Sequence, residues 1–247
     1  MNKFGMIYFL IPLILLTMSN QKMYAGPPFI TDDPEPVEFR HWECYISTIN
    51  NFGSNNVSGM LPNLEVNYGL VPNVQIHILL PFNYDYSSQR GFKSGYASTE
   101  LGLKYRFVQE TDNMPQIGTF PVFQLPTISN SEFGSGHIQL FIPLWAQKSW
   151  GKLTTYGGAG YGINPGINHL NWFFTGWEMQ YDFFQALTLG GEIYYHTNDA
   201  VDSHSTLAFN GGGSFNTGKK FHIIFSVGHS LINESFLTTY FGLLWTI

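Results

Sequence analysis

The closing stretch of the chain, LTTYFGLLWTI (residues 237–247), decides the fold class. One set of alternate residues is mostly large and apolar: Leu237, Thr239, Phe241, Leu243, Trp245 and Ile247. The other set is uncharged and mostly smaller or more polar: Thr238, Tyr240, Gly242, Leu244 and Thr246. Chain ends are usually frayed and polar, whereas a membrane barrel must close its last strand against its first and turn one face to lipid. The stretch therefore predicts an all-β fold, a transmembrane antiparallel up-and-down β-barrel.

The beginning of the chain predicts export. Lys3 is basic, residues 4–16 are apolar, and residues 17–25 are more polar with small side chains. This is the layout of a secretory signal peptide, and the apolar run is too short to cross a bilayer as a helix, which needs about 20 residues. We expect cleavage after Ala25, with cleavage after Ser19 as the alternative. Residues 1–25 are thus predicted to be a signal peptide, 26–37 a leader, and 38–247 the barrel.

The composition fits a protein that faces lipid. Charged residues make up 11% of the chain, aromatic residues make up 17%, and the formal net charge is −6. Soluble domains carry about 25% charged residues, whereas barrels replace surface charge with an apolar belt and aromatic girdles. The negative charge argues against nucleic-acid binding. Because Cys44 is the only cysteine, an internal disulfide is excluded.

The chain after the leader contains about twelve strand-like stretches. They are residues 38–50, 61–69, 74–82, 98–107, 117–126, 136–147, 152–163, 171–181, 186–196, 205–216, 221–230 and 235–247. Two are less regular, because Pro121 interrupts 117–126 and because 171–181 is aromatic on both faces. In the others an apolar face alternates with a polar or small one, as Leu101 and Leu103 do with Glu100 and Lys104.

A soluble β-sandwich would alternate too, but its strands are shorter. The stretches here mostly reach the roughly 9–11 residues of a tilted membrane-spanning strand. Aromatic residues also gather towards the strand ends, such as Trp145 with Trp150 and Trp172 with Trp177, and this is typical of aromatic girdles. Both features favour the barrel over the sandwich.

The connections alternate in length as well. Most links after even-numbered stretches are short, and the links after odd-numbered stretches tend to be longer: 51–60, 83–97, 127–135, 164–170 and 197–204. Short periplasmic turns with longer external loops are typical of outer-membrane barrels. An even number of strands then returns the C-terminus to the periplasm.

The leader, GPPFITDDPEPV (26–37), contains four prolines. It cannot be a central strand, because proline lacks a ladder donor. We interpret it as a periplasmic segment or as a plug in the barrel mouth. Asp32 and Asp33 could cap a turn, bind a cation or form a salt bridge to the barrel, and Pro34 after them favours the turn.

The polar strand faces supply candidates for the barrel lumen. They are Glu65, His77, Glu100, Lys104, Arg106, His137, Gln139, Glu178, Gln180, Glu192, His196 and His222. These residues could select polar or weakly cationic solutes, or they could form an interior network that neutralises itself and holds the barrel in shape. No HxxxH or CxxC pattern is present, so neither a metal site nor another cofactor is expected. The adjacent pair His204 and Ser205 would point to opposite faces of a strand, and catalysis is not expected.

Several stretches together resemble a family of bacterial outer-membrane proteins. The matching segments are GPPFITDDPEPV (26–37), LGLKYRF (101–107), PLWAQK (143–148), YGGAGY (156–161) with NPG (164–166), and LGGE (189–192). The family is labelled as transporters, or as similar to the outer-membrane protein of the MetA pathway of phenol degradation. The resemblance spans most of the mature chain and is most specific in the leader. The chain departs from many outer-membrane barrels in ending on Ile247 instead of Phe.

The resemblance implies a passive transporter or channel for small solutes, including hydrophobic or aromatic ones, in the outer membrane of a Gram-negative bacterium. The expected partners are outer-membrane lipid, the barrel-assembly machinery acting on the C-terminal strand, and a small molecule that the sequence does not name. The alternative is a structural or surface-binding barrel with a blocked lumen that acts through its extracellular loops. The family supplies no catalytic residues, and we expect no enzyme activity.

Overall fold

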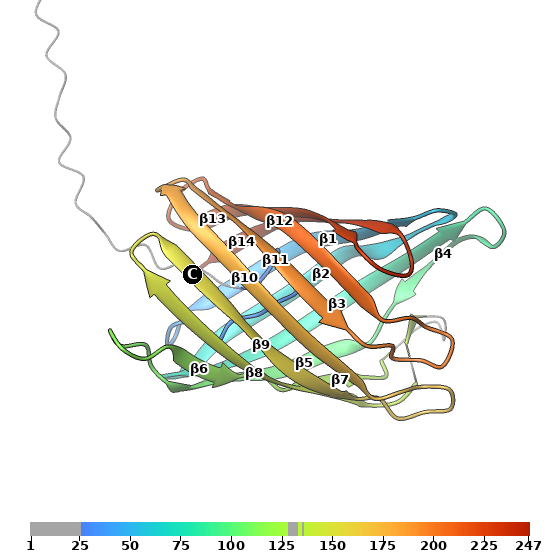
Figure 1. Ribbon diagram of the computed structural model, residues 1–247, viewed down its shortest axis with the longest axis horizontal. Helices are drawn as coiled ribbons and strands as arrows, with labels where there is room; N and C mark the ends of the chain where they lie inside the picture. Colours follow the sequence, from blue (N-terminus) through green and yellow to red (C-terminus); the bar gives the residue numbers. More distant parts are fainter. Residues whose placement is uncertain (1–25, 128–132, 135) are drawn as a thin grey trace, which may run out of the picture.

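The computed structural model describes residues 26–127, 133–134 and 136–247; the predicted signal peptide, with both candidate cleavage sites, lies outside them. The described strands form one antiparallel sheet that closes into a barrel (Figure 1). In chain order the strands are β1 (Trp42–Gly53), β2 (Asn56–Val71), β3 (Val74–Ser87), β4 (Gly91–Tyr96), β5 (Thr99–Val108), β6 (Gln116–Thr119), β7 (Val122–Leu125), β8 (Gln139–Trp150), β9 (Leu153–Ile163), β10 (Trp172–Phe184), β11 (Leu187–His196), β12 (Thr206–Asn216), β13 (Phe221–Ser230) and β14 (Phe236–Thr246).

The wall has twelve strand positions, because two of them each consist of two shorter strands. β4 and β5 both pair with β3, and the chain steps between them at Ala97 and Ser98. β6 and β7 both pair with β5 and β8 and are separated by Phe120 and Pro121. Since proline cannot donate to a ladder, Pro121 accounts for the break in the stretch predicted at 117–126. The predicted twelve-stranded up-and-down barrel is confirmed.

The C-terminal strand closes the barrel. β14 pairs with β1 from Glu43 opposite Thr246 to Gly53 opposite Phe236. Its residues alternate as the sequence predicts, because Leu244 is 2% exposed inside the barrel whereas Phe241 is 52% exposed outside. The apolar outer face of this strand therefore continues the outer face of the rest of the wall.

The barrel is apolar outside and largely polar inside. The outward side chains include Ile46, Leu103, Ile142, Trp177, Ile193, Phe209, Val227 and Phe241, all of them exposed. The buried inward side chains include Ser47, Asn67, Gln75, Lys104, Gln147, Thr154, Gln180, Asn210 and Ser226. A soluble protein buries its apolar side chains instead, and a lipid-facing belt around a polar interior is the membrane-barrel arrangement. Among the described residues, no helix is long and apolar enough to cross a membrane.

The two rims of the barrel differ. At one rim, the turn end, the connections between β2 and β3, β8 and β9, β10 and β11, and β12 and β13 are tight turns, and the C-terminus lies here (left in Figure 1). At the other rim, the loop end, most connections are longer. The separation into short and long connections agrees with the alternation predicted from the sequence.

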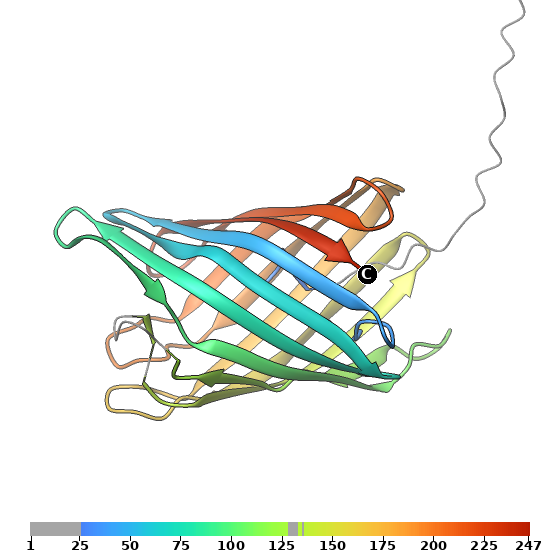
Figure 2. The same cartoon turned by 180° about the vertical axis from the view of Figure 1, so that it is seen from behind.

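Two connections at the loop end are shorter than predicted. The sequence predicts loops at 51–60 and 83–97, but β1 and β2 pair as far as Phe52 opposite Val57, and β3 pairs with β4 as far as Ser87 opposite Gly91. The polar and small residues of these segments were interpreted as loops, whereas backbone pairing extends them as hairpins. The β3–β4 hairpin projects beyond the other connections of this rim (Figures 1 and 2).

Candidate functional site

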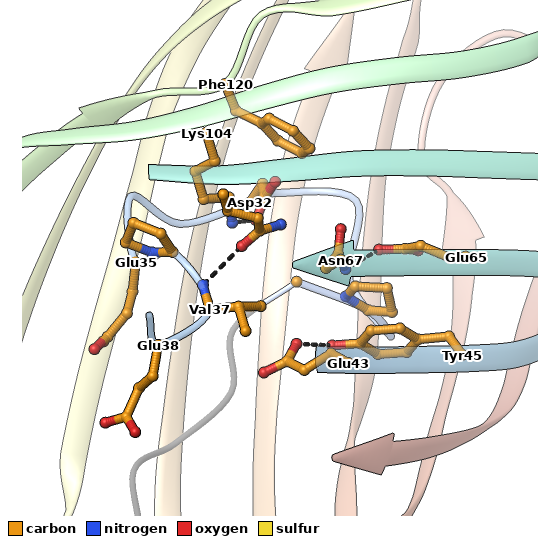
Figure 3. Close-up of a pocket in the computed structure, with 14 residues that line it drawn as sticks. Asp32, Glu35, Val37, Glu38, Glu43, Tyr45, Glu65, Asn67, Lys104 and Phe120 are labelled. Atoms are coloured by element: carbon orange, nitrogen blue, oxygen red, sulfur yellow. Dashed lines mark hydrogen bonds and ion pairs between the residues drawn. The ribbon is translucent and has the colours of Figure 1, made fainter. Parts of the chain in front are cut away.

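The leader, residues 26–37, lies inside the barrel as an irregular segment. Thr31 and Asp33 have no exposed surface, and Phe29 and Val37 are buried. The leader forms no ladder with the wall, and a single parallel bridge, between Phe39 and Gly69, joins the chain just after it to β2. Its prolines explain why it does not become a strand, and its position makes the lumen the candidate functional site (Figure 3).

Glu192 on β11 holds the middle of the leader. Its two carboxylate oxygens accept the backbone N–H groups of Ile30 at 2.9 Å and of Thr31 at 2.7 Å. Asn210 on β12 donates its side-chain amide to the same carboxylate at 2.5 Å. One wall side chain thereby supplies acceptors for two leader amides, and that of Thr31 would otherwise be buried without a partner.

Two further side chains contact the leader backbone. Gln75 on β3 accepts the backbone N–H of Val37 at 2.8 Å. Ser226 on β13 donates its hydroxyl to the carbonyl of Pro28, also at 2.8 Å. β3 and β11 are six positions apart in the twelve-position wall, so Gln75 and Glu192 hold the leader from opposite sides and the leader bridges the lumen.

Lys104 on β5 pairs with the two adjacent aspartates of the leader. Its Nζ lies 3.0 Å from Asp32 Oδ1 and 3.7 Å from Asp33 Oδ1, and it sits 5.1 Å from the centre of the Phe120 ring. Lys104 is 3% exposed, and a buried ammonium needs such partners to offset its lost hydration. Figure 3 shows Asp32 beside Lys104 under Phe120.

A second charged contact lies nearer the turn end. Glu35 of the leader is 3.5 Å from Arg106 Nη1, and it accepts amide hydrogen bonds from Gln116 at 3.2 Å and Gln147 at 3.4 Å. The leader is therefore held by charged and polar wall residues along both halves of its length.

Burial changes the acidity of Asp33. Its Oδ1 accepts the backbone N–H of Glu35, while its Oδ2 has no hydrogen-bond partner among the described residues. Burial is the largest influence and raises the pKa of Asp33 from 3.8 to about 8, with Lys104 opposing the rise and the Asp32 and Glu35 charges adding to it. The docked leader thus carries a carboxyl group that favours its protonated form at neutral pH.

A polar network lines the wall beside the leader. His77 Nδ1 is 2.7 Å from Asn67 Oδ1 and 3.5 Å from Glu65, which accepts the Asn67 amide at 2.8 Å. Gln124 donates to Glu100 at 2.8 Å. A small cavity of about 60 Å³ separates this side of the wall from the leader, and Glu65 lines it.

On the loop-end side of the leader the lumen widens into a cavity of about 1060 Å³, which we call the outer cavity. Leader residues 27–30 line its inner end, and residues of the β1–β2 and β13–β14 connections line its outer end. Aromatic rings from three strands form one side: Phe141 and Trp145 of β8, Trp172 and Phe174 of β10, and Tyr194 of β11. The indole N–H of Trp145 is buried and has no hydrogen-bond partner among the described residues.

The remaining candidate residues lie at several levels of the wall. Glu178 is fully buried and lies opposite Glu192 in the register, and Gln180 is buried near the turn end. His196 stacks on Trp172 with ring centres 4.6 Å apart. His222 lies 2.6 Å from Asn216 Oδ1, and Gln139 donates to Asn164 at 2.5 Å.

His137 does not belong to the inward face of a strand. The stretch predicted at 136–147 begins only at Gln139, and His137 is exposed before it. Gly136 has a φ of 72°, a left-handed conformation that glycine adopts readily and that does not continue a strand. The prediction that His137 lies on the polar face of a strand is therefore wrong.

The aromatic wall of the outer cavity was missed by the sequence interpretation. Trp145 is 2% exposed inside the barrel, whereas Trp150 and Trp177 are exposed outside. The pair Trp145 and Trp150 is separated by an odd number of positions, and such residues on one strand point to opposite faces. This odd spacing indicates that Trp145 and Trp150 cannot both belong to an aromatic girdle on the outer face.

No known family profile matches the chain, and no curated protein matches it in sequence. Among solved structures, an outer membrane channel from Pseudomonas putida F1 superposes with a TM-score of 0.71 at 15% identity, covering 87% of this chain and 98% of that one. The NanC porin gives a TM-score of 0.58 at 8% identity over 82% and 98% of the two chains. A KdgM porin in complex with disordered oligogalacturonate gives 0.54 at 12% identity over 81% and 98%. The chain therefore shares the barrel fold of outer-membrane channels and porins.

Proposed function

We propose that this chain is an outer-membrane barrel through which small solutes, including hydrophobic or aromatic ones, diffuse passively, with the leader lodged in their path. The outer cavity carries this proposal, because it occupies the lumen from the leader to the loop end and is lined by aromatic rings, uncharged polar groups and the side chains of Glu65 and Glu234. Ligand sites have this mixture of an apolar lining and a few polar groups. In this proposal the turn end lies in the periplasm and the loop end outside the cell, as is typical of short-turn and long-loop rims.

The contacts that hold the leader are consistent with its release from the lumen. Its contacts are hydrogen bonds and ion pairs to wall side chains, and no ladder joins residues 26–37 to the sheet. A neutral hydrogen bond contributes about 0.5–1.5 kcal/mol net and one to a charged group about 1.5–3 kcal/mol. Release of the leader would break these side-chain contacts, while every strand pair of the wall stays intact.

The proposal also covers how the protein is exported, how it is inserted and which lipid surrounds it. A signal peptide at 1–25 would export the chain, the barrel-assembly machinery would insert it through the C-terminal strand, and outer-membrane lipid would cover the apolar belt. The MetA-pathway resemblance supports an aromatic or hydrophobic solute, and the ring-lined cavity is consistent with such a solute.

A second candidate is a barrel with a blocked lumen that acts through its loops. The full burial of Thr31 and Asp33 favours it, because the docked leader leaves little space in the middle of the lumen. The projecting β3–β4 hairpin also carries the exposed side chains of Tyr86 and Phe92. Under this interpretation the leader would never leave.

Conductance in planar bilayers and swelling of solute-loaded liposomes would separate the two candidates. A Cβ built on Gly176 would lie 2.1 Å from Thr31 Oγ1, closer than real Cβ contacts, so Gly176→Ala should push the leader out of its docked position. Conductance should be lowest in the native protein, higher in Gly176→Ala, and highest after deletion of 26–37. No conductance or swelling in any form, including the deletion, would sink the transport proposal and favour the blocked barrel.

A further inference from the structure

The rings of the outer cavity are arranged as a cluster. Phe141 stacks on Trp172 with ring centres 4.7 Å apart and an interplanar angle of 16°. Phe174 meets Phe141 edge to face at 6.3 Å, meets Trp145 in a similar way at 6.1 Å, and stacks against Tyr194 at 6.0 Å. Aromatic faces carry partial negative charge, and a cation within about 6 Å of a ring centre is attracted to it.

The charged groups around the cavity have one sign. Its lining includes the carboxylates of Glu65 and Glu234 and no lysine or arginine. Lys104 and Arg106 lie towards the turn end, where they pair with Asp32 and with Glu35 of the leader. The cavity therefore has no full cation of its own to receive an anion.

Two buried acidic side chains lie at the level of the cavity. Glu65 lines it, and Glu192 accepts the side-chain amide of Asn210, which lines it too. The low-dielectric wall focuses the field of such groups on the lumen. A positively charged molecule in the outer cavity would gain from this field and from the ring faces, whereas an anion would be repelled by both.

We infer that the outer cavity binds organic cations, meaning molecules with an aromatic or alkyl body and an ammonium group, in preference to neutral or anionic molecules of the same size. The body packs against the rings of β8, β10 and β11, and the charge lies over a ring face within reach of the field of Glu65. The inference rests on the proposed function in one respect, since it names the charge class of the solute in the proposed path. It concerns binding, which can be measured without transport.

The test is calorimetric titration of the mature protein in phosphatidylcholine nanodiscs, a lipid with no net charge. Benzylammonium, benzyl alcohol and benzoate are close in size and differ in charge. Benzylammonium should bind at least about fivefold more tightly than benzyl alcohol, and benzoate should bind most weakly. Equal affinities for the three compounds, or a preference for benzoate, would overturn the inference.

Matched variants locate the site. Phe174→Leu should reduce the affinity for benzylammonium, whereas Phe173→Leu, its outward-facing neighbour on β10, should not. Glu65→Gln should narrow the difference between benzylammonium and benzyl alcohol, whereas Glu110→Gln at the turn end should leave it unchanged. A heat-dependent gel shift checks that each variant is folded, and Trp172→Leu serves in place of a Phe174 variant that fails this check. A charge preference that persists when the rings of Phe174 and Trp172 are removed would overturn the placement.

Failure of this inference differs from failure of the proposed function. Cation binding with no conductance or swelling in any form of the protein would sink transport and leave the binding site standing. Conductance and swelling together with tighter binding of benzoate would sink the charge preference and leave transport standing.

Discussion

The backbone N–H of Thr31 donates to Glu192 Oε2 at 2.7 Å across 161 positions of the sequence. This contact joins the segment before the first strand to the eleventh strand of the chain. Because the carboxylate of Glu192 also accepts the N–H of Ile30 and the amide of Asn210, three donors depend on one side chain.

Glu192→Gln should loosen the leader. The amide keeps one acceptor oxygen and places an NH₂ group against the donors of the leader, which should cost about 1–3 kcal/mol of docking free energy. The docked population should then fall by about 5- to 150-fold relative to the released one, and this would appear as faster proteolysis within residues 26–37 and higher conductance. Glu110→Gln is the control, and equal proteolysis of the two variants would contradict a role for Glu192 in holding the leader.

Lys104→Met should release the leader more strongly. It leaves the carboxylate of Asp32 in the lumen without its cation, and breaking one side of a buried ion pair costs about 3–5 kcal/mol. Adding Asp32→Asn should recover part of the docking, because the unpaired charge is then removed. Lys148→Met, which removes an ion pair with Glu110 at the turn end, should have no effect on proteolysis of the leader; release of the leader in that control would show that the assay reports general loosening.

Leader docking should weaken as the pH rises. The pKa of Asp33 is raised to about 8 in the docked state from an ordinary value of 3.8, so docking takes up a proton between these values. The contribution of Asp33 to docking is then fully present below about pH 4 and is progressively lost as the pH rises through about 8. Conductance recorded from pH 4 to 8 should rise in the native protein and vary less in Asp33→Asn; a native conductance that falls over this range would contradict the assignment.

Phe241→Arg should destabilise the barrel itself. Phe241 is near the middle of β14 and points outward, and an arginine on the lipid face near the bilayer midplane costs about 2–4 kcal/mol. Denaturant unfolding in phospholipid vesicles should report this loss in the free energy of unfolding. Phe241→Leu should lose much less, and comparable losses in the two variants would argue that the position does not face lipid.

The strands of the wall were predictable from the sequence because the pattern that determines them lies within short stretches of the chain. An every-other-residue pattern repeats in each strand, and turns punctuate it at regular spacing, so the strand number and the faces of β14 follow from residues close in the chain. The break at Pro121 was visible in the same way, since its cause is the proline itself. The strand at 91–96 was not predictable in this way, because its polar residues pair with β3 through their backbones.

The interior was harder to predict because its contacts are non-local. Whether 26–37 stays outside or enters the lumen depends on acceptors such as Gln75 and Glu192, which lie far along the chain. Parity indicates only that Trp145 and Trp150 point to opposite faces, and the stacking of Phe141 on Trp172 depends on the β8–β9–β10 arrangement in space. The error at His137 came from a strand start that Gly136 delays.

The covalent link between the leader and β1 has a consequence for how the barrel would open and close. Residues 38–41 join the two at the turn end, where Arg40 N–H donates to the carbonyl of Gly69. A leader that leaves the lumen stays tethered beside its own opening, and a short tether holds a segment at an effective concentration on the order of millimolar. Reclosure is then a first-order event within one molecule, and its rate does not depend on how much of the protein the membrane contains. A soluble peptide with the sequence of residues 26–37 would compete with the tethered leader only when added at about the same millimolar concentration.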